Sequence, residues 1–418
     1  MVVTVFGLGF VGLTTAVAFA DKAGVTVYGL EVNEERKNVI SNGELPFYEP
    51  GLDEALTRTL NKTFFVDVSV EEAVSKSDCV YYCVGTPYGE DGQADLTYLY
   101  SAIDQTLAVL DKEKFTVLVT KSTVPPSTTK ELVAAHIEAQ GFIVGTHLGI
   151  ANNPEFLREG HCWEDVTEAD RIVLGVSDTK SEKVLRKLYA DFSCPVHTVS
   201  LNTGEYIKYL SNTLLATLIS WSNEMSLIAD AIGDIQVAEA FRILHEDKRW
   251  GNPTCNMASY AYPGCGYGGY CLPKDTNALY ARAKAKGYEP CMLGQTIAVN
   301  DAMPRAIAKR IEAAATPDDH IGICGLSFKP GSDDTRDTPA AKIIEILIND
   351  GYRNICGYDP LAISEFKRYF DFSIEYAHTL EDVITASDVL VITTAWPEFS
   401  NLAEQASGAT IIDARYML

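Results

Sequence analysis

The chain of 418 residues has no apolar run long enough to cross a membrane, and the stretch Met1–Val5 enters a strand-like pattern without a basic leader. It also has no Cys-x-x-Cys pair and no histidine pair at metal-ligand spacing, although it contains 10 cysteines and 7 histidines. These absences argue against a membrane protein, a secreted disulfide framework and a metal site. We therefore expect a cytoplasmic protein in which most cysteines are small buried residues.

Basic residues are scarce, since 34 Lys and Arg stand against 57 Asp and Glu and give a net charge of −23. A charge of this sign repels nucleic acids and anionic membranes, so we expect neither as a partner. Hydrophobic residues make up 47% of the chain and charged residues 22%, which is typical of folded globular proteins. At roughly 150 residues per domain, the length predicts two or three domains.

Short β-branched or aromatic runs alternate with helical stretches over the first 150 residues. The runs are Val2–Phe6, Thr26–Leu30, Cys79–Val84, Thr116–Thr120 and Phe142–Val144. This alternation predicts a parallel sheet with crossover helices. A long helix is expected next, from a cap at Asn202 or Thr203 to about Ile232, because no Gly or Pro lies between Gly204 and Gly233.

The C-terminal part of the chain repeats the N-terminal part in the same order. Residues 71–87 align without a gap on 381–397, residues 6–9 on 324–327, and residues 28–31 on 356–359. Either the two parts are related, or they share strand-end patterns common to α/β domains. Both interpretations predict an α/β protein with two doubly wound Rossmann-like domains joined by a long central helix. We expect domain boundaries at 1–200, 201–298 and 299–418.

A glycine-rich turn, Gly7–Gly12, follows the first predicted strand and opens an alanine-rich helix. Its glycines permit a tight turn and a close approach to a pyrophosphate, which a helix N-terminus attracts. Glu31 lies 19 residues after Gly12, where a carboxylate accepts the ribose hydroxyls and repels a 2′-phosphate. The pattern predicts an NAD site; the alternative is a strand–helix turn whose glycines serve packing alone.

A second glycine-rich segment, Ala261–Asp275, ends in Cys271-Leu-Pro-Lys274-Asp275. So many glycines indicate a backbone that faces a ligand. A cysteine beside a lysine can act as a thiolate nucleophile. The alternatives are a buried structural cysteine, or Cys265 in the same loop, which lacks the charged pair after it.

Other polar residues lie where a site would be expected. Lys208 and Asn212 share one face of the long helix, which is either part of a site or a solvated stripe. Glu155 and Glu159 lie four residues apart in a segment that could also begin a helix. Further polar segments occupy the strand ends, the edge where open α/β sheets bind ligands: 86–87, 121–125, 328–330 and 333–337.

Together these motifs resemble those of the UDP-glucose/GDP-mannose dehydrogenase family over essentially the whole chain. The matching segments are 7–12, 84–87, 121–125, 153–160, 266–275, 328–330 and 334–337. The family oxidises the C6 hydroxyl of a nucleotide sugar to a carboxylate with two NAD in succession. The resemblance therefore implies an NAD-binding domain at 1–200, a central helical dimerisation domain at 201–298, and a nucleotide-sugar-binding domain at 299–418.

The resemblance also implies catalytic roles. Cys271 would hold the substrate as a thiohemiacetal and then as a thioester, while Lys208 and Asn212 would stabilise the oxyanion. Asp275 would orient or activate a water shared with Lys208. Glu155 would act as acid or base in thioester hydrolysis.

Further site residues follow from the same resemblance, with Thr123 holding the hydrolytic water. The residues implied for NAD are Gly7, Gly9, Phe10, Val11, Gly12, Glu31, Arg36, Gly85, Thr86, Pro87, Ser122, Thr123, Glu159, Lys274 and Arg336. The residues implied for the nucleotide sugar are Phe156, Leu157, Lys208, Arg249, Tyr260, Gly268, Lys329 and Arg415. No metal is expected.

Three positions depart from the family pattern or subdivide it. Glu31 replaces the usual Asp and keeps the charge. The segment from Arg249 to Tyr260 is longer than usual, and in the family this arginine reaches the site across the dimer. Tyr270 resembles bacterial UDP-glucose enzymes, whereas N-acetylhexosamine enzymes usually carry His there and GDP-mannose enzymes Ser.

The resemblance thus implies oxidation of UDP-glucose to UDP-glucuronate for polysaccharide synthesis. The alternatives are the same reaction on UDP-N-acetylmannosamine or GDP-mannose, or a simple two-electron NAD dehydrogenase with a structural cysteine. A nucleotide-binding module without activity would not need Cys271, Lys208 and Glu155 together.

The long helix also carries an apolar stripe, which predicts a homodimer. Its members recur at spacings of three and four residues: Leu214, Leu218, Trp221, Met225 and Ile228. The alternative is that this stripe packs inside its own chain.

Overall fold

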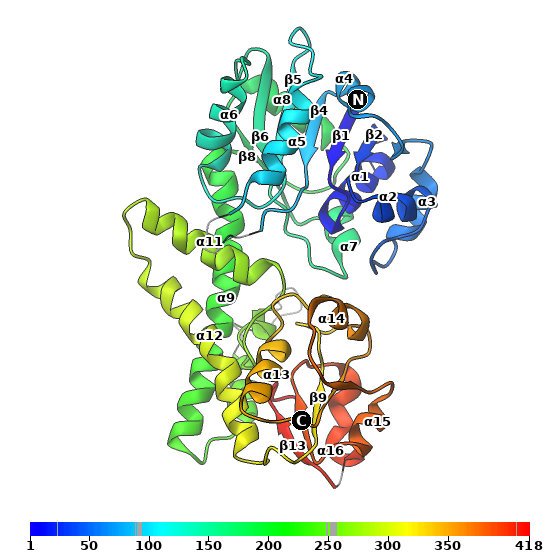
Figure 1. Ribbon diagram of the computed structural model, residues 1–418. Coiled ribbons are helices and arrows are strands. Elements are labelled where there is room, and N and C mark those ends of the chain that lie inside the picture. Colours follow the sequence, from blue (N-terminus) through cyan, green and yellow to red (C-terminus); the bar gives the residue numbers. More distant parts are fainter. Residues whose placement is uncertain (23, 88, 90–93, 248–249, 251–256, 407) are drawn as a thin grey trace. The chain divides into compact units, whose positions relative to one another are not determined.

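The computed structural model describes residues 1–22, 24–87, 89, 94–247, 250, 257–406 and 408–418. The chain divides into two compact units, Met1–Leu210 and Ser211–Leu418. Each unit contains its own sheet with helices packed around it, so the predicted α/β class is confirmed (Figure 1). Within the described ranges, every helix is too short or too polar to span a bilayer.

The first unit is built on an eight-stranded sheet. Its strands are β1 (Val2–Phe6), β2 (Thr26–Leu30), β3 (Phe64–Phe65), β4 (Cys79–Tyr82), β5 (Thr116–Thr120), β6 (Leu148–Asn152), β7 (Ile172–Val176) and β8 (Val196–Val199). The order is β3-β2-β1-β4-β5-β6-β7-β8, and β6–β7 is the antiparallel pair among otherwise parallel neighbours. The first six strands follow the doubly wound order in which ligands bind at the carboxyl ends of the strands.

Helices of this unit connect the strands and cover the sheet. They are α1 (Phe10–Lys22), α2 (Glu34–Ser41), α3 (Leu52–Thr59), α4 (Val70–Lys76), α5 (Thr97–Leu107), a π-helix at Thr128–Val133, α6 (Ala134–Ala139), α7 (Cys162–Thr167) and α8 (Thr179–Leu188). Asn33, Ser69 and Asp178 cap α2, α4 and α8 by accepting a backbone N–H of the first turn. The alanine-rich α1 is buried from Gly12 to Ala20, which lets it pack closely on the sheet.

The predicted strand at Phe142–Val144 is wrong. Val144 forms an isolated bridge with Leu148, and the strand β6 begins there instead. Gly141 and Gly145 flank the short run and have φ values of +79° and +82°, so the backbone turns at both ends. The longer run that follows is the one that pairs with β5.

The long helix α9 spans Leu201–Ile232 and contributes residues to both units. Its end agrees with the prediction, since Gly233 follows with φ of +79°. The predicted cap at Asn202 or Thr203 is wrong. The hydroxyl of Ser200 accepts the backbone N–H of Thr203 at 3.2 Å, so the cap lies two residues before the first candidate and the helix begins at Leu201.

The second unit contains a five-stranded parallel sheet in the order β11-β10-β9-β12-β13. Its strands are β9 (Ile321–Cys324), β10 (Ile355–Tyr358), β11 (Glu375–Tyr376), β12 (Val389–Ile392) and β13 (Thr410–Asp413). Its other elements are α10 (Val237–His245), a 3-10 turn at Met257–Ser259, α11 (Cys271–Ala285), α12 (Cys291–Glu312), α13 (Pro339–Asn349), α14 (Ile363–Tyr369), α15 (Leu380–Thr385), a 3-10 turn at Pro397–Asn401 and α16 (Leu402–Gln405).

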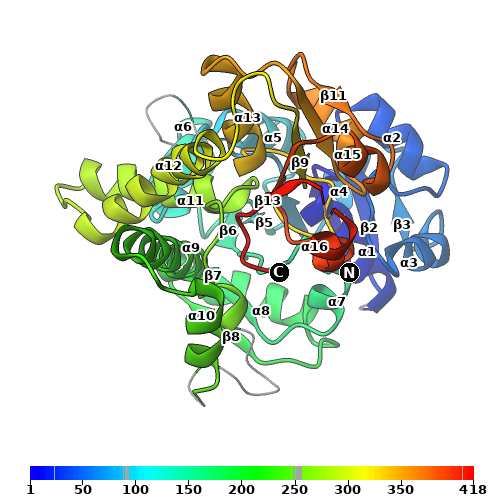
Figure 2. The ribbon, with the colours of Figure 1, turned by 90° about the horizontal axis from the view of Figure 1, so that it is seen from below.

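Within this unit the later turns of α9 lie beside α10 and α12 (Figure 2). The hydroxyl of Ser220 donates to the carbonyl of Thr296 at 2.8 Å, which joins α9 to α12. The rings of Trp221 and Phe241 are 6.1 Å apart, which joins α9 to α10.

The internal repeat extends to matching hydrogen bonds. In the first unit Glu31, after β2, accepts the backbone N–H of Leu8 at 2.9 Å. In the second unit Asp359, after β10, accepts the backbone N–H of Leu326 at 2.8 Å. The two sheets are therefore organised around the same strand–turn contact, as two Rossmann-like domains require.

Candidate active site

The glycine turn after β1 leaves room for a ligand at one position. A Cβ at Gly12 would lie 1.7 Å from the carbonyl oxygen of Gly7, and a Cβ at Gly7 would lie 2.8 Å from that of Cys83. Both glycines are therefore required by close packing. At Gly9 a Cβ would have no neighbour within 4 Å, so this glycine faces open space beside the start of α1. The predicted residues of this segment lie in the turn and in the first residues of α1: Gly7, Gly9, Phe10, Val11 and Gly12.

Glu31 lies against this turn at the end of β2. One carboxylate oxygen accepts the N–H of Leu8 at 2.9 Å and an N–H of the Arg36 guanidinium at 3.2 Å, and the other accepts the N–H of Asn33 at 2.9 Å. The Glu31 side chain is nearly buried, whereas Arg36 is partly exposed. A fixed carboxylate beside an open glycine turn suits the adenosine ribose of NAD.

The loops after β4 and β5 are bonded to each other at the same edge of the sheet. The hydroxyl of Ser122 donates to the carbonyl of Val84 at 2.6 Å, and that of Thr86 donates to the carbonyl of Thr123 at 2.8 Å. Gly85 is exposed between them. Five predicted cofactor residues lie on these loops: Gly85, Thr86, Pro87, Ser122 and Thr123.

Glu155 and Lys208 form a buried ion pair. The Nζ of Lys208, on α9, lies 3.0 Å from Oε1 of Glu155, which follows β6. The backbone N–H of Leu157 donates to the other carboxylate oxygen at 2.7 Å. The two side chains are 7% and 8% exposed, so the pair is shielded from water and its Coulomb attraction is strong.

The titration of this cluster follows from its burial and its charges. Burial raises the pKa of Glu155, but the charge and hydrogen bond of Lys208, the N–H of Leu157 and the charge of Lys121 outweigh it, so the net pKa is lowered. Lys121 is buried, and burial lowers the pKa of its ammonium group. Glu155 is therefore a carboxylate at neutral pH.

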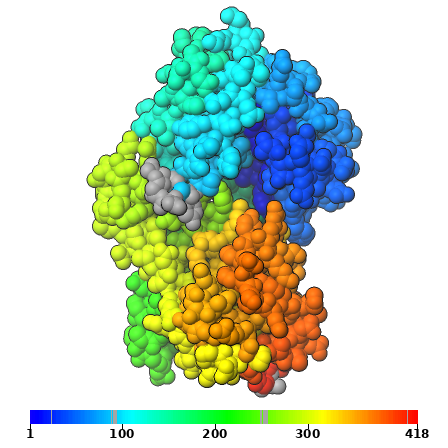
Figure 3. Space-filling view, viewed as in Figure 1, coloured from blue at the N-terminus to red at the C-terminus, as the bar shows by residue number. Residues whose placement is uncertain are grey.

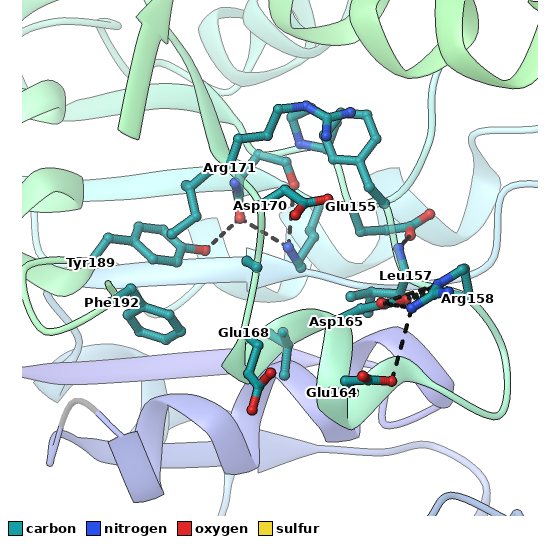
Figure 4. Close-up of a pocket in the computed structure, with 17 residues that line it drawn as sticks. Glu155, Leu157, Arg158, Glu164, Asp165, Glu168, Asp170, Arg171, Tyr189 and Phe192 are labelled. Atoms are coloured by element: carbon teal, nitrogen blue, oxygen red, sulfur yellow. Dashed lines mark hydrogen bonds and ion pairs between the residues drawn. The ribbon is translucent and has the colours of Figure 1, made fainter. Parts of the chain in front are cut away.

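The Phe156 ring lies close to two cations beside this pair. The Nζ of Lys208 is 5.7 Å from its ring centre, and the Cζ of Arg171 is 4.3 Å from it. A cavity of about 240 Å³ opens next to Glu155, with Tyr189 and Phe192 on one side and the paired Arg158 and Asp165 on the other (Figure 4).

Asn153 anchors the chain just before Glu155. Its Oδ1 accepts from Lys121 at 3.0 Å and from the hydroxyl of Tyr189 at 2.6 Å, and its Nδ2 donates to the carbonyl of Val173 at 2.8 Å. The segment 153–160 is irregular, so the alternative that it begins a helix is wrong. The start of α7 lies at Cys162, beyond Glu159.

The second unit holds the candidate nucleophile. Cys271 is exposed at the first residue of α11, whereas its rival Cys265 is buried and burial raises the pKa of its thiol to about 11. Asp275 is fully buried and accepts from Lys274 at 2.5 Å and from Nδ2 of Asn212 at 2.6 Å. Burial lowers the pKa of Lys274, but the carboxylate of Asp275 and the charges of Cys271 and Tyr270 outweigh burial, so the net pKa is raised. This lysine is therefore a cation.

Arg336 lies beside the same helix start. Its guanidinium donates twice to Asp334, each bond at 2.8 Å, and its Cζ lies 4.6 Å from the ring centre of Tyr270. Its carbonyl accepts the N–H of Gly269 at 2.9 Å. Arg336 thus borders the loop that precedes Cys271.

The residues expected to bind the nucleotide sugar are partly brought together. A Cβ at Gly264 would lie 2.3 Å from a guanidinium nitrogen of Arg415, so Arg415 lies directly on the glycine loop. A Cβ at Gly268 would lie 2.5 Å from the carbonyl oxygen of Asp337. Tyr260 and Lys329 are partly buried in the same unit. Arg249 lies outside the described residues.

The predicted site therefore falls into two sets, each assembled within one unit. The first set surrounds the Glu155–Lys208 pair, and the second surrounds Cys271 and Asp275. Sequence reasoning gave no role to Lys121 or Asn153, which hold the chain at Glu155, although both lie in motifs that it singled out. In the described ranges no three His, Cys, Asp or Glu side chains are grouped so as to hold a metal.

Comparison with known families covers nearly the whole chain. Residues 1–193 match the NAD binding domain of the UDP-glucose/GDP-mannose dehydrogenase family, residues 202–302 its central domain, and residues 322–418 its UDP binding domain.

Curated relatives match over most of their length. The UDP-glucose 6-dehydrogenase AglM of Haloferax volcanii is 33% identical over 415 residues, which cover 97% of this chain and 94% of the relative. The UDP-glucose 6-dehydrogenase of Rhizobium meliloti is 35% identical over 413 residues, which cover 96% and 91%.

Solved structures match equally well. A UDP-glucose dehydrogenase from Pyrobaculum islandicum superposes with a TM-score of 0.89 at 32% identity, covering 99% of this chain and 97% of the other. A UDP-D-ManNAc dehydrogenase from Pyrococcus horikoshii superposes with a TM-score of 0.86 at 28% identity, covering 100% and 96%.

Proposed function

Because the chain belongs to the UDP-glucose/GDP-mannose dehydrogenase family, and is thus an NAD-dependent nucleotide-sugar dehydrogenase, we propose that it oxidises UDP-glucose to UDP-glucuronate. The observation that carries this choice is that the curated relatives reported above, matched over 94% and 91% of their length, are UDP-glucose 6-dehydrogenases. Tyr270, before the cysteine, favours the same sugar by resemblance. The second candidate substrate is UDP-N-acetylmannosamine, which the similarity to the Pyrococcus horikoshii enzyme supports.

The glycine turn and Glu31 fit NAD. The open side of Gly9 admits a pyrophosphate at the N-terminus of α1, and the Glu31 carboxylate can accept ribose hydroxyls. When bound, NAD accepts a hydride in each of two successive oxidations. A 2′-phosphate would meet the Glu31 carboxylate in a nearly buried position, so NADP is disfavoured.

Cys271 keeps the substrate bound between the two oxidations. The first removes a hydride and a proton from the C6 alcohol and gives an aldehyde. The Cys271 thiolate then adds to the aldehyde carbon to form a thiohemiacetal, and loss of a second hydride gives a thioester. The Lys274 cation, fixed by Asp275, favours the thiolate at the start of α11.

Lys208 stabilises the negative charge that develops on the C6 oxygen. Its ammonium is fixed by Glu155 at 3.0 Å, so it needs little reorganisation during the reaction. Asn212, one turn further along α9, is held by Asp275 at 2.6 Å and assists the same oxygen.

Hydrolysis of the thioester needs a base and a positioned water. Glu155 is ionised at neutral pH, because its pKa is lowered, and can take a proton from that water. Thr123 holds the water, and Asp275 orients it. Attack of the water on the thioester carbon releases the carboxylate and returns Cys271 to the thiolate.

Binding of the substrates follows the family pattern. We propose that NAD contacts the loops after β4 and β5 and, in addition, Arg36, Glu159, Lys274 and Arg336. We propose that the nucleotide sugar contacts Phe156, Leu157, Tyr260, Gly268, Lys329 and Arg415. Arg249 is proposed to reach the site of a second subunit. The corresponding division of the chain is 1–200, 201–298 and 299–418.

We also propose a homodimer formed through α9. Along its apolar stripe Leu214, Trp221 and Ile228 are 53%, 40% and 46% exposed, which opposes the alternative that the stripe packs inside its own chain. The C-terminal part of α9 reaches the surface of its unit, at the lower left of Figure 3. Pairing this stripe across a two-fold axis would cover it.

We propose a cytoplasmic location as well. The nine cysteines in the described part of the chain are free thiols, which supports a reducing compartment.

A substrate panel tests the proposed function. Initial rates of NAD reduction are measured with UDP-glucose, UDP-N-acetylmannosamine and GDP-mannose. We expect kcat/KM for UDP-glucose to exceed the others by at least about tenfold, or about 1.4 kcal/mol. If kcat/KM were instead at least about tenfold higher for UDP-N-acetylmannosamine or for GDP-mannose, that sugar would replace UDP-glucose as the proposed substrate.

A further inference from the structure

The glycines of the loop before Cys271 have almost no space for a side chain. A Cβ at Gly266 would lie 2.8 Å from Oδ1 of Asn300, and Gly266 has φ of +108°. Gly269 has φ of +77°, and a Cβ there would lie 3.0 Å from the Phe328 ring. Such a loop has little intrinsic conformational preference, because glycine backbone is permissive. Something outside the loop must therefore fix it.

Asn300, on α12, provides that restraint. Its Oδ1 accepts the backbone N–H of Tyr267 at 2.7 Å, and its Nδ2 donates to the backbone carbonyl of the same residue at 3.2 Å. Asn300 is 6% exposed, so water does not compete for these bonds. Two bonds to one residue fix both the position and the orientation of its peptide groups.

Two other contacts complete the restraint on either side. Oδ1 of Asn223, on α9, accepts the N–H of Gly264 at 2.7 Å. The carbonyl of Arg336 accepts the N–H of Gly269 at 2.9 Å. Gly268, proposed above to contact the nucleotide sugar, lies between the Tyr267 and Gly269 anchors, and Cys271 lies two residues after Gly269.

We propose that Asn300 is a positioning residue for the nucleotide-sugar loop and for Cys271. It acts through the Tyr267 backbone and does not itself touch the reacting atoms. This inference rests on the proposed role of Cys271, and it adds the element that holds both the thiol and the substrate-facing backbone in place.

Asn300→Asp gives the sharpest test. The ionised carboxylate keeps an acceptor for the Tyr267 N–H but points a second oxygen at the Tyr267 carbonyl, where a donor is needed. We expect KM for UDP-glucose to rise about tenfold at about pH 8, with KM for NAD unchanged. Burial and the facing Tyr267 carbonyl oxygen should raise the pKa of the introduced carboxyl group. As the pH falls, the protonated acid restores a donor, so the ratio of the variant's KM to the wild-type KM should fall toward one.

Thiol reactivity gives a readout independent of turnover. Alkylation of Cys271 by iodoacetamide is followed by peptide mass spectrometry, with exposed Cys291 as the internal reference. In Asn300→Ala, which removes both bonds, we expect Cys271 to react at least about threefold more slowly, because a displaced helix start favours the thiolate less. Cys291 should react at the wild-type rate.

Thr296→Val is the matched control. Thr296 lies one turn before Asn300 on α12 and is 4% exposed, but its hydroxyl bonds Met292 and Thr217, away from the loop. It should leave KM and Cys271 alkylation unchanged. Equal effects in the control, a parallel change at Cys291, or a KM ratio that does not fall in acid would overturn the positioning role.

The outcomes separate this inference from the proposed function. Asn300 would keep its positioning role, and Cys271 would lose its role as nucleophile, if Cys271 were alkylated more slowly in Asn300→Ala while Cys271→Ser remained active. Asn300 would lose its positioning role, and Cys271 would keep its role as nucleophile, if alkylation and KM were unchanged while Cys271→Ser was inactive.

Discussion

Removal of one charge from the buried Glu155–Lys208 pair should be costly. Glu155→Gln keeps the shape of the side chain but leaves the buried Lys208 and Lys121 without the carboxylate that interacts with both. Breaking a buried pair on one side costs about 3–5 kcal/mol. At about 3 kcal/mol and roughly 2–4 °C per kcal/mol, the Tm of the variant should fall by roughly 6–12 °C.

The stability lost in Glu155→Gln should depend on pH in one direction. Burial raises the pKa of Glu155, but Lys208, Leu157 and Lys121 outweigh it and lower the pKa below the ordinary value. A carboxyl group of this kind adds stability above its unfolded pKa and loses it as the pH falls through its folded pKa. The difference in unfolding free energy between wild type and variant should therefore be full at neutral pH and shrink in acid.

The same variant should uncouple oxidation from hydrolysis. Without a general base, release of the acid should slow by roughly 10²–10⁴-fold, while both hydride transfers proceed. Rapid mixing with NAD and UDP-glucose should give a burst of about two NADH per site, and intact mass spectrometry should detect the thioester on Cys271.

Glu182→Gln is the control for this substitution. Glu182 pairs with Arg186 at 2.8 Å on the surface of α8, where such a pair contributes about 0–1 kcal/mol. It should leave both stability and turnover nearly unchanged. Near-wild-type turnover and Tm in Glu155→Gln would refute the role given to the buried pair.

Other substitutions test separate parts of the site. Cys271→Ser should lower turnover at least about 10³-fold without a change in Tm, because serine is a poorer nucleophile at neutral pH; steady-state rates near those of the wild type would exclude the thioester. Glu31→Ala should reduce the preference for NAD over NADP about tenfold or more, because the variant loses the charged hydrogen bonds to the ribose of NAD and the repulsion of the 2′-phosphate of NADP. Fluorescence titration with both dinucleotides measures this preference, and an unchanged ratio of the two dissociation constants would contradict the role of Glu31 at the ribose. Trp221→Glu should convert a dimer to a monomer in analytical ultracentrifugation at micromolar concentration, because a charge would be buried in the apolar stripe; a wild-type chain that is an active monomer would refute the dimer.

The fold could be predicted well because its signals are local. One short stretch of sequence holds the strand Val2–Phe6, the glycine turn after it and Glu31. The long helix ends at Ile232, just before Gly233, as its sequence indicates. The wrong strand at Phe142–Val144 shows the limit of such reasoning. A three-residue apolar run cannot be told from a true strand until the partner β5 selects the longer run.

The helix start was missed for a similar reason. Ser200, Asn202 and Thr203 are all good caps by type. The selection of Ser200 depends on where β8 ends at Val199, which the residues near the cap do not reveal.

The candidate site was predictable where motifs carry it. Cys271, Glu155 and Lys208 were identified by position, but their partners depend on tertiary contacts. Asn300 comes into contact with Tyr267 from 33 residues away, and Asn153 meets Lys121 from 32 residues away. A polar residue in a helix or at a strand end gives no sign of such a partner in a single sequence.

The stoichiometry of the reaction tests the central claim most directly. With UDP-glucose limiting and NAD in excess, total NADH is measured by absorbance and the products by mass spectrometry. We predict two NADH and one UDP-glucuronate for each UDP-glucose consumed, because Cys271 retains the aldehyde for a second oxidation. One NADH per UDP-glucose, with a free aldehyde as product, would contradict it.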